Sequence, residues 1–131
     1  MKEAYVTFEV AKLLKEKGFD WTVDTYYCDD SNYVQHDIIE YRKENYNSHK
    51  LHISAPTQQM VCRWLRERGI HIMETIGCDV DRTPRIFYGA VIALFNDYGD
   101  IDYRNPLDEN GYDSPEDAVE AAIQYVLTNL I

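Results

Sequence analysis

Residues 70–95 read IHIMETIGCDVDRTPRIFYGAVIALF, and this stretch decides the fold. Ile70, Ile72 and Ile76 occupy alternate positions, the period of two that indicates a strand. The segment Ile86–Phe95 is apolar on both faces, which is typical of a strand in the middle of a sheet. The polar segment Gly77–Pro84 between them predicts a turn. The sequence therefore predicts a hairpin whose second strand is central.

Three segments outside this hairpin carry apolar residues at helical spacing, and each begins with a capping signal. Thr7 and Ser114 can accept the free N–H groups at the start of the first and third helices. Gly18 and Gly69 supply the left-handed residue that ends the first and second helices. The predicted helices are Thr7–Gly18, Ser54–Gly69 with Pro56 in the first turn, and a third from Ser114 to Leu130 with Pro115 at its first position.

The rest of the chain predicts shorter elements. Aromatic and β-branched residues alternate over Phe19–Cys28 and indicate a strand. Tyr33–Tyr41 fits a second strand, although Ile38–Arg42 could instead form a short helical turn. Leu51 and Ile53 suggest a brief extended piece. Turns or loops are expected at Asp29–Asn32, Glu44–Lys50 and Asn96–Asp113. We expect one α+β domain over residues 1–131, with a mostly antiparallel sheet of about four to five strands packed by three helices.

The negative charge of the chain is concentrated near its C-terminus. The formal net charge is −10, and the residues from Asp97 onward include nine acidic residues and only one basic residue, Arg104. Binding to DNA or RNA without sequence preference depends on Lys and Arg that neutralise phosphates. The composition therefore excludes non-specific nucleic-acid binding. Part of the acidic excess belongs to the start of the third helix, where the helix dipole favours carboxylates.

The N-terminal sequence, the apolar runs and the cysteines indicate the cellular compartment. The start MKEAYVTFEV does not look like a secretion signal, and no apolar run approaches the length of a membrane span. Cys28, Cys62 and Cys78 are an odd number without CxxC spacing, which suits reduced thiols. We expect a cytoplasmic protein that does not act at a membrane.

Motifs for catalysis are weak. Asp79-Val80-Asp81-Arg82-Thr83 matches the DxDxT loop of haloacid-dehalogenase-type phosphatases. That family also needs a phosphate-binding lysine in a large downstream domain, and no lysine follows Lys50 here. His49 and His52 have HxxH spacing in a segment that is expected to be loop and strand, and we interpret them as ordinary histidines. The sequence predicts no catalytic residues, no metal site and no cofactor.

Tyrosine is the unusual feature of the composition. Eleven tyrosines are present, and three of them lie in the acidic Asn96–Asp113 segment. Tyrosine is enriched at protein interfaces because it gives a large contact area at low entropy cost. We therefore predict a partner-binding site formed by Tyr98, Tyr103, Arg104 and Tyr112.

Two segments resemble a group of small proteins. The helix Ala55–Glu67 with the following Gly69–Ile72, and the ending Tyr112–Ile123, are similar to small uncharacterised proteins of gut bacteria and their phages. That group has an "APTQ…WLRE" helix and a C-terminal "Y-[ST]-x-E-x-A-x-x-A" helix. The N-terminal helix and aromatic strand also fit, so the resemblance covers most of the chain. It implies an accessory protein of a phage or mobile element, and it implies no catalytic residue.

Three hypotheses follow. The leading one is a non-enzymatic module that binds a protein partner or a second copy of itself. The alternative is an anti-defence protein that sequesters a small nucleotide signal through Arg63, Arg82 and Arg85, or blocks a host factor with its acidic surface. The third is a hydrolase that uses Asp79 and Asp81.

Overall fold

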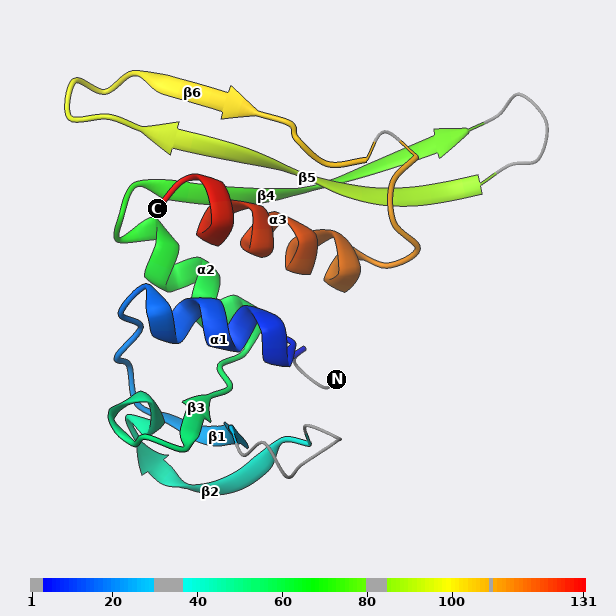
Figure 1. Cartoon of the computed structure of the whole chain (residues 1–131). Helices are drawn as coiled ribbons and strands as arrows, with labels where there is room; N and C mark the ends of the chain where they lie inside the picture. Colours follow the sequence, from blue (N-terminus) through cyan, green and yellow to red (C-terminus); the bar gives the residue numbers. More distant parts are fainter. Residues whose placement is uncertain (1–3, 30–36, 80–84, 109) are drawn as a thin grey trace.

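The computed structural model describes residues 4–29, 37–79, 85–108 and 110–131 (Figure 1). Its elements in chain order are α1 (Phe8–Glu16), β1 (Val23–Cys28), β2 (Ile39–Glu44), the short 3-10 helix η1 (Tyr46–Ser48), β3 (His52–Ser54), α2 (Gln58–Arg66), β4 (Ile70–Asp79), β5 (Arg85–Phe95), β6 (Ile101–Arg104) and α3 (Pro115–Asn129). Among the described segments, no helix has the length and apolarity needed to cross a membrane.

The strands form two antiparallel three-stranded sheets. One has the order β2-β1-β3 and the other the order β4-β5-β6. The α+β class is confirmed, with six strands in two sheets where one sheet of four to five strands was expected. β5 has a neighbour on each side, and β1 pairs with β2 and β3 in a sheet of its own.

The three helices form a layer between the two sheets (Figure 1). One continuous cluster of buried apolar side chains includes members of all three helices and both sheets. Trp64, Tyr46 and Phe19 are the largest of its fully buried side chains. Burial of such side chains is the main favourable contribution to folding, at about 25 cal/mol per Å² of apolar surface.

The predicted caps of the first and third helices are confirmed. The side-chain oxygen of Thr7 accepts the N–H of Val10 at 3.4 Å, and the Ser114 hydroxyl accepts the N–H of Asp117 at 3.1 Å. Pro115 lies at the start of α3, where its missing N–H has no consequence. Gly18 follows α1 with a φ of +88°, which only glycine adopts without strain.

The start of α2 differs from the prediction. Thr57 caps this helix, because its side-chain oxygen accepts the N–H of Met60 at 3.2 Å. Pro56 therefore precedes the cap and does not lie in the first helical turn. The Pro56 carbonyl instead accepts the N–H of Val6 at 3.1 Å and ties the N-terminal segment to α2.

The first sheet follows the predicted alternation. Val23, Thr25 and Tyr27 point into the core from β1. The strand alternative for the Tyr33–Tyr41 segment is confirmed from Ile39 onward, whereas residues 30–36, with most of the expected Asp29–Asn32 turn, lie outside the described residues. The expected polar loop after residue 44 contains η1.

The second sheet confirms the hairpin and its central strand. β4 pairs with β5 over its whole length, from Ile70 opposite Leu94 to Asp79 opposite Arg85. The strand thus continues three residues into the segment that was expected to be a turn. Residues 80–84, which carry Asp81, Arg82 and Thr83, lie outside the described residues.

The prediction of one long polar connection over Asn96–Asp113 is wrong. The side-chain oxygen of Asn96 accepts the N–H groups of Tyr98 and Asp100, at 2.9 and 3.0 Å, and closes a tight turn. Gly99 lies in this turn with a φ of +82°. The chain then returns as β6, so a second hairpin replaces half of the expected loop.

Candidate functional site

One face of the second sheet is not covered by a helix (Figure 1). Side chains of Ala90 and Ile92 are buried in the core beneath α3. Because side chains alternate along a strand, the neighbouring positions of β5 point the opposite way. We call the exposed large apolar side chains on that side the open face, which consists of Met73, Phe95, Ile101 and Tyr103.

The open face is apolar and exposed. Phe95 lies opposite Ile101 in the β5–β6 pairing, and Tyr103 lies opposite Ala93. The exposed fractions are 43% for Phe95, 44% for Ile101 and 61% for Tyr103. The ring of His71 packs edge-on against Phe95 at 4.8 Å between ring centroids. Exposed apolar side chains that gather on one face are typical of an interaction surface.

The structure brings three of the four predicted partner-binding residues to the β5–β6 hairpin. Tyr98 lies in the turn and is 91% exposed, and Tyr103 belongs to the open face. Arg104 points to the other side of β6, where its Nε lies 3.3 Å from Asp102 Oδ2. Tyr112 lies elsewhere, because it exchanges two backbone hydrogen bonds of 2.9 and 2.8 Å with Tyr88 at the other half of β5.

Exposed carboxylates surround this hairpin. Asp97 and Asp100 flank the turn, and Asp102 lies on β6; the side chains of all three are exposed. Arg104 offsets only part of this charge, through its contact with Asp102. The hairpin therefore combines an apolar face with an acidic rim.

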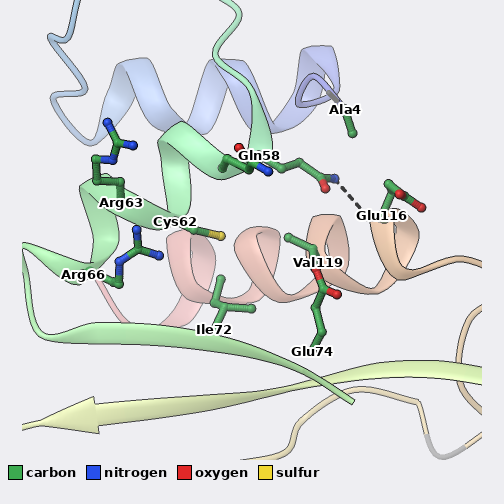
Figure 2. Close-up of a pocket in the computed structure, with 10 residues that line it drawn as sticks. Ala4, Gln58, Cys62, Arg63, Arg66, Ile72, Glu74, Glu116 and Val119 are labelled. Atoms are coloured by element: carbon green, nitrogen blue, oxygen red, sulfur yellow. Dashed lines mark hydrogen bonds between the residues drawn. The ribbon is translucent and has the colours of Figure 1, made fainter. Parts of the chain in front are cut away.

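A groove lies between α2 and β4, away from the open face (Figure 2). Its volume is about 570 Å³, within the range of roughly 300–1,000 Å³ that ligand pockets occupy. The lining residues come from the N-terminal segment, α2, β4 and α3: Ala4, Gln58, Gln59, Cys62, Arg63, Arg66, Ile72, Glu74, Glu116 and Val119.

Charges of opposite sign lie at the two ends of this groove. Figure 2 shows Arg63 and Arg66 at one end and Glu74 and Glu116 toward the other. Within the described residues, neither arginine belongs to an ion pair. Burial is the main reason that the pKa of the Cys62 thiol is raised; the Arg66 charge opposes this shift and the Glu74 charge adds to it.

A hydrogen-bonded contact fixes the end wall of the groove. The side-chain amide of Gln58 donates to the Glu116 carbonyl and to the Glu120 carboxylate, each at 2.9 Å. The other Glu120 oxygen accepts the N–H of Thr7 at 2.7 Å. These bonds join α2, α3 and the start of α1, so the groove is a preformed part of the fold.

The arginines proposed for a nucleotide are not gathered. Arg63 lies in the groove, whereas Arg85 lies at the start of β5, with its Nη2 3.3 Å from Asp113 Oδ1. Arg82 lies outside the described residues. Sequence reasoning missed Arg66, Glu74 and Glu116 because they reach the groove from three separate elements. The available signal was the i, i+3 spacing of Arg63 and Arg66, which places both on one helix face.

The two histidines with HxxH spacing belong to an aromatic cluster on the first sheet. Tyr26 stacks on Tyr46 and on His52, in both cases with ring centroids 4.4 Å apart. His49 Nε2 lies 2.5 Å from Glu44 Oε1. A hydrogen bond from Arg42 is the main reason that the pKa of Glu44 is lowered, and His49 adds to it.

This cluster has a structural role. Lys15 of α1 donates to the carbonyls of His49 and His52, at 2.9 and 2.8 Å, and so joins the helix to the loop before β3. In the described parts of the chain, no three His, Cys, Asp or Glu side chains are arranged to hold a metal ion.

Comparison of the chain with models of known protein families, with curated protein sequences and with solved structures gave no match.

Proposed function

We propose that the protein is a non-enzymatic module that binds a protein partner through the open face and the adjoining β5–β6 turn. The observation that carries the proposal is the set of exposed apolar side chains on a helix-free sheet face, with Phe95, Ile101 and Tyr103 side by side. Aromatic and aliphatic side chains at the centre of a contact supply most of its binding energy.

The rim determines the kind of partner. Carboxylates at Asp97 and Asp100 lie in the turn beside the apolar centre, and Asp102 lies on the opposite side of β6, all in the most acidic part of a chain of net charge −10. Complementary charge speeds association and disfavours wrong partners. The partner proposed is therefore a protein with an apolar patch inside a basic rim. A second copy of this chain fits less well, because two acidic rims repel.

The resemblance to small proteins of gut bacteria and their phages supports a biological context. We place the protein in the bacterial cytoplasm, as an accessory protein of a phage or mobile element that captures a host protein. This context rests on the quoted helix segments and not on the open face.

Affinity capture with matched variants tests the proposal. Proteins bound by the wild type from a bacterial lysate are compared with those bound by an Ile101→Asp/Tyr103→Ala variant. Leu51→Ser is the control, because Leu51 is also exposed but lies just before β3 on the first sheet. The purified partner is then titrated calorimetrically, and we expect the double variant alone to lose binding. A partner that the double variant retains and Leu51→Ser loses would contradict the proposal.

Sequestration of a small nucleotide remains a second proposal. It is supported by Arg63 and Arg66, which offer positive charge in a groove. Calorimetry with a panel of linear and cyclic nucleotides tests it, and Arg63→Gln is expected to abolish any binding. Heat exchange that is the same for wild type and Arg63→Gln would remove this proposal.

A further inference from the structure

The outer edge of β4 has no strand partner among the described residues. β4 is the end strand of its sheet, and within that part of the chain β5 is its strand neighbour. Phe95 donates its N–H to the Gly69 carbonyl at 2.9 Å, whereas Tyr88 exchanges hydrogen bonds with Tyr112 on the opposite side of β5. Odd-numbered residues of β5 therefore bond toward β4, and even-numbered residues bond away from it.

The same alternation shows which residues of β4 direct their backbone N–H and C=O groups away from β5. In an antiparallel pair, residues that exchange no hydrogen bonds with each other direct their N–H and C=O groups outward. Ile76 is opposite Tyr88, and Ile72 is opposite Ile92, so both belong to this class. The outward-directed groups thus belong to Ile72, Glu74 and Ile76. An edge of this kind is a template for another strand.

The side chains of these edge residues line the groove. Ile72 and Glu74 both point into it (Figure 2). Ile76 lies next on the same side and is 69% exposed. An added strand would therefore hydrogen-bond to this edge and direct alternate side chains toward the groove. From Ile72 to Ile76 and one residue beyond each end, the edge spans roughly 20 Å, enough for about six residues at about 3.4 Å each.

The charges that line the groove determine which side chains an added strand would carry at each end. The last turn of α2, with Arg63 and Arg66, leads through a short turn into the start of β4, and Figure 2 shows Arg66 nearer than Arg63 to Ile72 at this end of the groove. An antiparallel strand would run with its C-terminal part beside these arginines. A carboxylate there would pair with them, and a basic residue nearer the other end would face Glu74 and Glu116.

We propose that the groove between α2 and β4 binds an extended peptide segment that adds antiparallel to β4 and places an acidic side chain at Arg63 and Arg66. Backbone hydrogen bonds supply affinity in this mode, and side-chain pockets supply specificity. A second copy of β4 is a poorer occupant, because each chain carries a net charge of −10. The site is separate from the open face and does not depend on it.

Selection from a phage-displayed library of random octapeptides tests the groove. We expect enriched peptides with Asp or Glu at a fixed position in the C-terminal half and alternating apolar residues before it. Arg63→Gln with Arg66→Gln should weaken binding of a selected peptide at least about tenfold, because hydrogen bonds to charged groups are involved. Lys17→Gln with Lys43→Gln removes the same charge elsewhere and should have little effect. Arg63→Glu with Arg66→Glu should instead select Lys or Arg at that position.

The backbone pairing has its own test. N-methylation of the peptide at successive amides should abolish binding at every second position and leave the others nearly unchanged. Ile76→Pro removes an outward N–H without removing a β4–β5 hydrogen bond, so it should abolish binding while the circular dichroism spectrum stays that of the wild type. Sedimentation of the free protein should show a monomer.

Three results would overturn the proposal. The first is a library that yields no peptide dependent on Arg63 or Arg66. The second is an N-methyl scan without a period of two. The third is a dimer that Ile76→Pro dissociates, which would assign this edge to a second copy.

Discussion

The ring of Phe87 lies directly against Gly77, its cross-strand partner in the β4–β5 hairpin. A Cβ added at Gly77 would lie 2.5 Å from Phe87 Cε2, and one added at Gly111 would lie 2.5 Å from Cδ2 of the same ring. The ring is thus held between two glycines. This contact joins the hairpin to the segment that leads into α3.

Gly77→Ala should therefore destabilise the protein. The new methyl group would overlap the far end of the Phe87 ring, whose base packs against Gly111, and overpacking of this kind costs about 1–3 kcal/mol. The free energy of unfolding in urea measures the effect. In a Phe87→Leu background the same substitution should cost much less, and an equal cost in both backgrounds would contradict the explanation.

Glu120→Ala should also destabilise the fold. Its carboxylate accepts hydrogen bonds from the Thr7 N–H and the Gln58 amide, and hydrogen bonds to a charged group contribute about 1.5–3 kcal/mol each when they are well formed. We expect a loss of about 1–3 kcal/mol, because Glu120 is only half-buried. Glu116→Ala is the matched control, since only the backbone carbonyl of Glu116 is used. Thermal unfolding of the two variants measures the difference. Equal melting temperatures would refute the role of the Glu120 carboxylate in stabilising the fold.

Stability should fall at alkaline pH because of Tyr27. Burial is the main reason that the pKa of Tyr27 is raised from 10.0 to about 12, and the charges of Glu120 and Glu9 add to it. The unfolded chain releases this proton first, so the stabilisation is complete below pH 10 and is lost as the pH rises toward 12.

Tyr27→Phe isolates this contribution. The variant also loses the hydrogen bond from the Tyr27 hydroxyl to the Val6 carbonyl, of 2.7 Å, so it should be less stable at neutral pH. Its stability should nevertheless change less than that of the wild type between pH 10 and 12, as measured by urea unfolding. The exposed Tyr103→Phe variant should follow the wild type. Parallel pH profiles for wild type and Tyr27→Phe would show that another group is responsible.

The thiols should differ in reactivity. Burial raises the pKa of Cys62 and so reduces the thiolate that reacts, whereas the Cys78 side chain is exposed. With N-ethylmaleimide at pH near 8, Cys78 should be modified well before Cys62, as followed by mass spectrometry of the peptides. In denaturant the two rates should become similar. Faster labelling of Cys62 in the folded protein would be incompatible with its position in the groove wall.

Local signals predicted the helices well. Thr7 and Ser114 each lie next to the groups that they cap, and Gly18 and Gly69 end their helices within a few residues, whereas the Thr57 cap of α2 was not predicted. Such features depend on contacts between residues that are close in the chain, so they can be predicted from a single sequence. The β4–β5 hairpin was predictable for the same reason, since its partners are close in sequence.

Pairing between distant segments was not predictable from the sequence. Whether β1 joins β5 or a separate sheet depends on which edges are free, and alternation along one strand does not encode that. β6 was missed because its four residues are polar in two positions and exposed in all of them. The sequence also did not show that the predicted partner-binding residues separate in space, because Tyr112 pairs with Tyr88 and lies away from the turn that holds Tyr98.

The sheets lie on opposite sides of the helical layer, so each presents an exterior that is supported from within by helices. Changes to the solvent-facing side of one sheet leave the other sheet's supporting contacts in place. The molecule therefore suits stepwise redesign, in which one exterior is randomised for a new ligand while the opposite one serves as an unaltered attachment point for a label or a solid support.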